Sequence, residues 1–135
     1  MLKIVAIDHL VLRTDNLEPM LQFYGDVLGC TLEREDLELG LYQLRAGTGL
    51  IDLVTLDGTL GKQGGPAPSA KGNNLDHLCL QIEPEEETKI LQYLEAQGIE
   101  AGPFKERYGA QGFGPSLYLQ DPDGNTVELR CHRYS

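Results

Sequence analysis

Residues 7–12 read IDHLVL and return almost unchanged as LDHLCL at residues 75–80. Both stretches show the alternation of a half-buried strand. Each is followed by a helical pattern that stops at a glycine, Gly29 in the first half and Gly98 in the second. Glycine suits the left-handed position that ends many helices. The chain is therefore interpreted as two copies of one module.

The remaining pattern completes each module with short strands. The expected helices cover 17–28 and about 84–97, and the expected later strands cover 30–37, 39–46 and 50–56, then 99–101, 116–120 and 126–132. The sequence DPDGN at 121–125 favours a tight turn, because Pro fixes φ and Gly permits a positive φ. The Gly-, Pro- and Ser-rich residues 58–74 favour an exposed linker. The prediction is an α+β fold of two tandem βαβββ modules, about 1–57 and 75–135, within one domain, 1–135.

Composition excludes several classes of protein. A chain of 135 residues suffices for one compact domain. It lacks a run of roughly 20 apolar residues and has no signal-peptide pattern, so we expect a cytoplasmic protein with no membrane partner. The three cysteines are far apart without a C-x-x-C pair, which argues against disulfides and thiolate zinc sites. A net charge of −10 without a basic stripe argues against nucleic acid as a partner.

One helix covers one face of a four-stranded sheet, and the other face must be buried or functional. We expect two such open faces to form a cleft. The side chains on the helix side should be Leu10, Leu12, Leu78, Leu80, Val127 and Leu129. Alternate positions on each strand then face the cleft.

Alternation places polar side chains at matching positions of the two cleft faces. His9 and His77 begin the first strand of each module, and Asp52 and Glu128 lie in the last strand of each, within LIDL and TVEL. Cys79 follows on the face of His77 and should line the pocket. A single strand His is more often an ordinary hydrogen-bonded residue, but the paired recurrence favours a site. Two imidazoles and two carboxylates suit a divalent metal ion, with Zn, Ni, Fe, Mn and Co all open.

These residues resemble the vicinal oxygen chelate superfamily, which includes glyoxalase I, extradiol dioxygenases, fosfomycin-resistance and bleomycin-resistance proteins. The matching elements, in order along the chain, are 8–10, 23–29, 76–78 and 121–128. The resemblance implies paired βαβββ modules in an incomplete eight-stranded barrel around a metal ion. It also implies a homodimer that acts on a small-molecule substrate.

Glyoxalase I is the most similar named activity. In that comparison His9, Asp52, His77 and Glu128 bind the metal ion, with Asp52 standing where the family has Glu. The implied reaction is a lyase-type isomerisation of a small oxygenated substrate, a thiol conjugate, through an enediolate. Glu128 would be the catalytic base, and Arg13 would anchor an anionic part of the substrate.

Three other activities in the superfamily stay open. His9, His77 and Glu128 alone make the two-His-one-carboxylate set of an Fe(II) extradiol dioxygenase. Tyr118 begins a stretch similar to that family's signature and would contact substrate, although no His stands at 109–111. A fosfomycin-type thiol transferase would use the same three ligands. A bleomycin-resistance-like protein would bind its ligand without catalysis.

Overall fold

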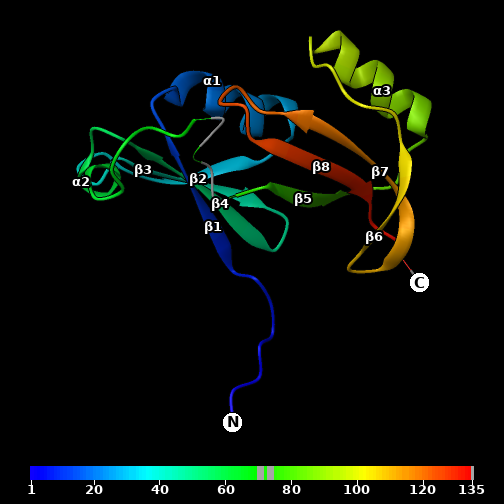
Figure 1. Cartoon of the computed structure of the whole chain (residues 1–135), viewed down its shortest axis with the longest axis horizontal. Helices are drawn as coiled ribbons and strands as arrows, with labels where there is room; N and C mark the ends of the chain where they lie inside the picture. The colour runs from blue at the N-terminus through cyan, green and yellow to red at the C-terminus, as the bar shows by residue number, and fades with distance from the viewer. Residues whose placement is uncertain (70–71, 73–74, 135) are drawn as a thin grey trace. The chain divides into compact units, whose positions relative to one another are not determined.

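The computed structural model describes residues 1–69, 72 and 75–134. The chain forms two compact units, Met1–Ser69 and Ala70–Ser135. Each unit contains a mixed four-stranded sheet (Figure 1), and this confirms the predicted α+β fold of two βαβββ-like modules. Among the described residues, no helix combines the length and apolar character needed to cross a membrane.

The first unit has the strand order β1-β4-β3-β2, with β1 parallel to β4 and the other pairs antiparallel. Its elements are β1 His9–Thr14, α1 Leu17–Leu21, the π-helix η1 Gln22–Val27, β2 Thr31–Asp36, β3 Leu41–Ala46, β4 Gly49–Thr55 and α2 Thr59–Lys62. The predicted helix 17–28 is thus one α-helical turn continued as a π-helix. Apolar side chains from the helices and the sheet are buried together: Leu12, Met20, Phe23, Tyr24, Leu44, Ile51 and Leu53.

The second unit repeats the order as β5-β8-β7-β6, again with only the first pair parallel. Its elements are β5 His77–Ile82, α3 Glu87–Ala96, β6 Lys105–Gly109, β7 Gly112–Gln120 and β8 Thr126–Cys131. The buried apolar side chains of this unit are Leu78, Ile90, Leu94, Leu117, Leu119, Val127 and Leu129. Leu10 and Leu80, which alternation assigned to the core, are only half-buried.

Both predicted helix-ending glycines are confirmed. Gly29 has φ +84° and Gly98 has φ +76°, in the left-handed region that residues with a Cβ rarely adopt. A glycine in the left-handed conformation therefore ends the helical segment of each module.

The predicted strand at 99–101 is wrong. Ala101 makes a single bridge to Leu119, and the edge strand is instead β6, Lys105–Gly109. β6 and β7 form a hairpin through a stretch whose glycines hid the strand pattern, because glycine is weakly strand-forming. The predicted linker also contains the short helix α2. Its residues 70–71 and 73–74 lie outside the described residues.

Candidate metal-binding residues

In the first unit, His9 and Asp52 lie on neighbouring parallel strands. Nδ1 of His9 lies 2.7 Å from a carboxylate oxygen of Asp8. Asp52 is only 3% exposed, and its Oδ2 accepts a hydrogen bond from Nε2 of Gln43 at 3.1 Å. Its buried Oδ1 has no hydrogen-bond partner among the described residues. The pKa of His9 is raised, chiefly by the hydrogen bond to Asp8, with the negative charges of Asp52 and Asp8 adding to it against some desolvation.

In the second unit, His77 and Glu128 are in direct contact. Nε2 of His77 lies 3.2 Å from Oε1 of Glu128, a side chain that is 5% exposed. Nδ1 of His77 lies 2.7 Å from a carboxylate oxygen of Asp76. The imidazole thus has an aspartate on one nitrogen and a buried glutamate on the other.

The two units place these groups in the same register. In the first, the residue two positions after His9 on β1 is paired with Asp52 on β4. In the second, the residue two positions after His77 on β5 is paired with Glu128 on β8. Both imidazoles also have the preceding aspartate on Nδ1. Sequence alternation predicted the pairs, whereas the role of Asp8 and Asp76 was missed although both stand in the repeated motif.

An aspartate on Nδ1 is the arrangement that orients a metal-binding histidine toward its ion through Nε2. In the second unit Nε2 of His77 lies 3.2 Å from Oε1 of Glu128, so a metal ion would take the place of this contact. The buried, unpartnered Oδ1 of Asp52 is a further donor of the type that a divalent ion uses. The donor types therefore suit a metal ion. Among the described residues, however, no three or more His, Cys, Asp or Glu side chains are grouped so that they could hold one.

Tyr118 lies beside the pair of the second unit. It is the β7 residue paired with Glu128, and its ring meets the His77 ring edge-on with centroids 5.5 Å apart. The guanidinium of Arg107 stacks on the Tyr118 ring, with its Cζ 4.1 Å from the ring centroid. Nη1 of Arg107 also donates to the backbone carbonyl and to the hydroxyl of Ser116. Tyr118 therefore lies next to His77 and Glu128, and a substrate contact by Tyr118 stays a prediction.

Arg13, the predicted anion anchor, contacts backbone. Its Nη1 donates to the carbonyl of Pro66, and its Nη2 donates to the carbonyls of Gly61 and Gly65 at 3.1 and 2.6 Å. Its Nε is buried and has no hydrogen-bond partner in the part of the chain that the structure describes. In this structure Arg13 holds the loop after α2, so a substrate contact by Arg13 stays a prediction.

Cys79 is the residue paired with Glu128 on β5. Partial desolvation raises the pKa of its thiol to about 11 although the residue as a whole is exposed, and the negative charge of Glu128 adds to the effect while Arg130 opposes it. The free thiol is therefore protonated at neutral pH. Arg130 lies two residues after Glu128 on β8 and therefore on the same face of the sheet.

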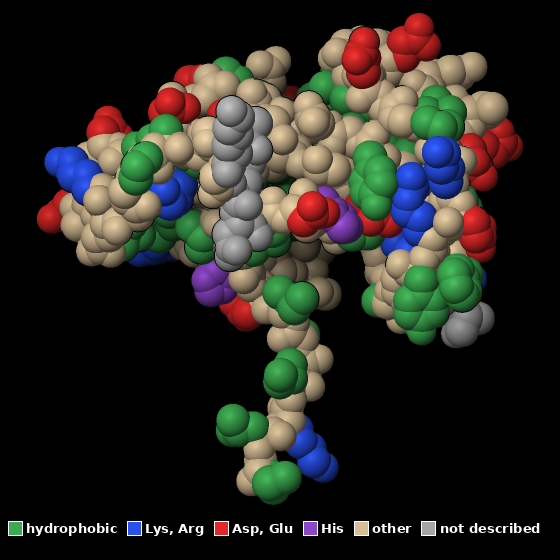
Figure 2. All heavy atoms as spheres, in the orientation of Figure 1, with side chains coloured by type: hydrophobic (Ala, Val, Ile, Leu, Met, Phe, Trp, Pro, Cys, Tyr) green, Lys and Arg blue, Asp and Glu red, His purple; other side chains and the backbone are tan. Residues whose placement is uncertain are grey.

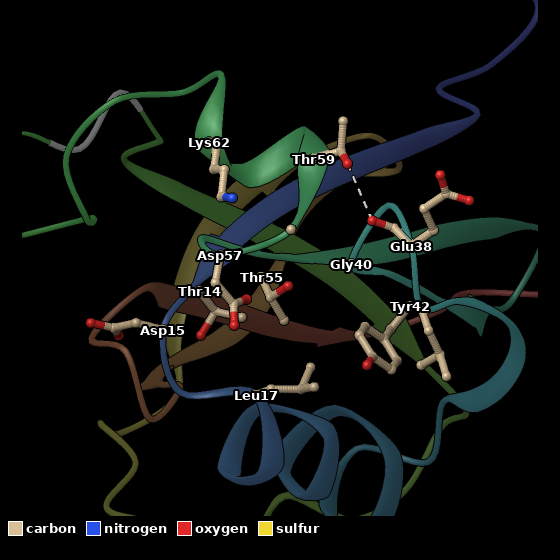
Figure 3. Close-up of a pocket in the computed structure, with 12 residues that line it drawn as sticks. Thr14, Asp15, Leu17, Glu38, Gly40, Tyr42, Thr55, Asp57, Thr59 and Lys62 are labelled. Atoms are coloured by element: carbon tan, nitrogen blue, oxygen red, sulfur yellow. Dashed lines mark hydrogen bonds between the residues drawn. The ribbon is translucent and has the colours of Figure 1, made fainter.

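A cavity of the first unit lies apart from these residues. It encloses about 740 Å³ and is lined by residues at the end of β1 and around α2, among them Thr14, Asp15, Asp57 and Lys62. Figure 3 shows Lys62 pointing down from α2 on the side where Asp57 and Thr14 lie. His9 stands at the opposite end of β1 from Thr14, and no predicted site residue lines this cavity.

Comparison with known proteins assigns the family. The profile of the Glyoxalase/Bleomycin resistance protein/Dioxygenase superfamily matches residues 6–129. The chain is 29% identical over 129 residues to Virulence protein STM3117 of Salmonella typhimurium, covering 91% of this chain and 81% of that protein. An integron cassette protein from the mobile metagenome of V. cholerae has a similar structure, with TM-score 0.73, 29% identity and coverage of 98% and 99% of the two chains.

A lactoylglutathione lyase from Agrobacterium tumefaciens shares the fold at TM-score 0.65 and 24% identity, with coverage of 92% and 91% of the two chains. The chain belongs to the glyoxalase/bleomycin resistance/dioxygenase superfamily. This superfamily is also called the vicinal oxygen chelate superfamily. The proteins that this chain is similar to include an integron cassette protein and a virulence protein.

Proposed function

We propose that His9, Asp52, His77 and Glu128 bind one divalent first-row metal ion and that the protein is a glyoxalase I-like lyase. The observation that carries the proposal is the same register of an oriented imidazole and a buried carboxylate in both units. A repeated strand pair has no structural need for His at one position and a buried acid at the other. A metal ion accounts for both, because two carboxylates neutralise its charge.

A bound metal ion would polarise substrate oxygens and stabilise developing negative charge. The residues of the chain supply the remaining steps. Glu128 is buried and would move a proton between adjacent carbons of the substrate, since burial withholds competing water from the carboxylate. Tyr118, in contact with His77, would form the wall against which a small oxygenated substrate, such as a thiol conjugate, is positioned.

An Fe(II) dioxygenase is the second candidate, and the environment of Asp52 is the observation that favours it. Gln43 already binds one oxygen of this carboxylate. If Asp52 serves only to bind Gln43 within the sheet and does not bind the ion, His9, His77 and Glu128 remain as a two-His-one-carboxylate set.

Equilibrium dialysis distinguishes the four-ligand metal site from the three-ligand site. Wild-type protein and the variants His77→Ala, Asp52→Ala and Asp15→Asn are dialysed against Ni, Zn, Co, Mn and Fe(II), and bound metal is measured. We expect one ion per chain in wild type and in Asp15→Asn, and loss of binding in the other two variants. Unchanged affinity in Asp52→Ala with loss in His77→Ala would leave the three-ligand site. An absence of binding by wild type would refute the metal proposal.

Activity assays then test the reaction. The metal-loaded protein is supplied with methylglyoxal and glutathione, and separately with catechols and oxygen. The proposal expects formation of the thioester product with Ni or Zn and its loss in Glu128→Gln. Oxygen uptake with Fe(II) would support the dioxygenase instead. A homodimer belongs to the same proposal and is measured by light scattering.

A further inference from the structure

Two guanidinium groups on the second unit have no acidic partner. Arg107 and Arg130 appear in none of the salt bridges among the described residues, and both donate to backbone carbonyls instead. The chain contains 21 acidic and 11 basic residues, so acidic partners are plentiful. Figure 2 shows blue Lys and Arg side chains grouped over this unit. Two unpaired guanidiniums in so acidic a protein point to an anion supplied from outside the chain.

Arg130 is the stronger case. It is 4% exposed, and its Nη2 donates to the carbonyl of Gly112 at 3.0 Å. Its Nη1 is buried and has no hydrogen-bond partner within residues 1–69, 72 and 75–134. A buried cation with an unsatisfied N–H is costly unless a counter-charge completes it. Because Arg130 is nonetheless buried in the folded chain, we expect a bound anion to offset its desolvation free energy by accepting a hydrogen bond from Nη1.

The β6–β7 hairpin is shaped around this guanidinium. A Cβ at Gly109 would collide with Nη1 and Cζ of Arg130, and a Cβ at Gly114 would lie 3.1 Å from Nη2. Gly109 does not have a positive φ, so its lack of a side chain is needed for space and not for backbone conformation. The glycines of this hairpin thus admit the charged head of Arg130.

The two cations lie next to the proposed metal ligands of the same unit. Arg107 stacks on Tyr118, whose ring contacts His77. Arg130 follows Glu128 by two residues on β8, so both side chains point to the same face of the sheet. The main-chain partner of Arg130 on β7 is Ser116, whose hydroxyl accepts a hydrogen bond from Arg107.

We propose that Arg130, with Arg107, forms an oxyanion subsite that binds a carboxylate or phosphoryl-type group of a small anionic substrate. A guanidinium presents planar N–H donors that match either group. The proposal deepens the proposed function, on which it rests for the reacting end of the substrate at His77 and Glu128. The subsite itself rests only on the two arginines and the hairpin.

The test uses metal-free full-length protein titrated calorimetrically with malonate and, separately, with inorganic phosphate. We expect wild type to bind at least one probe, and Arg130→Lys, which keeps the charge but loses the fork, to weaken binding about 10-fold. Gly109→Ala should weaken it similarly, because its Cβ displaces Nη1. Arg45→Gln removes a guanidinium that pairs with exposed Glu33 and is the matched control, with unchanged affinity. Preference for malonate or for phosphate identifies the chemistry of the group.

If Arg130→Lys unfolds at a much lower temperature than wild type, Arg107→Gln gives a second variant, because Arg107 is only part-buried. Its loss should also lower the affinity for the probe. Lack of binding by wild type, or equal affinity in Arg130→Lys, Gly109→Ala and Arg107→Gln, overturns the subsite. Metal dialysis of the same proteins separates the two proposals. Probe binding without metal binding supports the subsite and refutes the metal site, and the reverse result refutes the subsite alone.

Discussion

Asp8→Asn removes the charge that faces Nδ1 of His9 at 2.7 Å while keeping the size of the side chain. If Asp8 orients the imidazole for a metal ion, metal affinity should fall although no ligand has been changed. Loss of such a supporting carboxylate costs about 10- to 100-fold in metal affinity. Asp8 is 90% exposed, so water screens it, and we expect the lower end, about 10-fold.

The second unit supplies an independent copy of the experiment. Asp76 contacts His77 at the same distance and is 97% exposed, so Asp76→Asn should also cost about 10-fold. The two aspartates contact different histidines and share no partner. Their effects should therefore multiply, and the double variant should lose about 100-fold.

Affinity for Ni or Zn is measured by competition with a chromophoric chelator at pH 8 and pH 6, with Asp15→Asn as control. Because Asp8 raises the pKa of His9, its removal lowers that pKa and reduces proton competition for the imidazole. The loss in Asp8→Asn should thus be smaller at pH 6 than at pH 8. Changes under about twofold in both single variants, with unaltered thermal unfolding, would refute the orienting role.

Three further outcomes follow from other contacts. Leu117→Ala, at a fully buried position, should lower the free energy of unfolding by about 2–5 kcal/mol in urea titration, and a smaller loss would mean that the sheet collapses onto the cavity. Gly61→Ala places a Cβ against the carbonyl of Thr55 and should cost about 1–3 kcal/mol, with wild-type stability contradicting that close approach. Cys79, with its pKa of about 11, should be alkylated at pH 8 about 10-fold more slowly than a thiol of pKa 9.0, because its thiolate fraction is about 100-fold lower and its thiolate is about 10-fold more nucleophilic. The rate should be higher in Glu128→Gln, and equal rates in both proteins would exclude the influence of Glu128.

The modules and their candidate ligands could be predicted because the signals are local and occur twice. Alternation on a strand fixes which face a residue takes once one neighbour is known to be buried. That reasoning placed Asp52 and Glu128 at matching positions, and the pairing of β1 with β4 and of β5 with β8 confirms the register. The helix-ending glycines were equally local, since a positive φ needs no long-range partner.

The edge strand of the second unit could not be predicted by the same means. Glycines at 109, 112 and 114 weaken the strand signal of the β6–β7 hairpin. Gly109 and Gly114 leave room for the guanidinium of Arg130, which reaches the hairpin from β8, whereas Gly112 has a positive φ. Arg13 is a similar case. Its carbonyl partners lie about 50 residues away along the sequence, and no sequence pattern around Arg13 predicts them.

The sequence by itself determined the repeat, the order of strands and helices, and the four side chains proposed as ligands, because periodicity and a recurring motif act over a few residues. Tertiary structure decided which charges are neutralised. It gave each imidazole an aspartate on Nδ1, bound Arg13 to a loop, and left Arg130 buried with a free N–H. Such pairings depend on which backbone carbonyls and side chains are brought together in space, and only the folded chain brings them there.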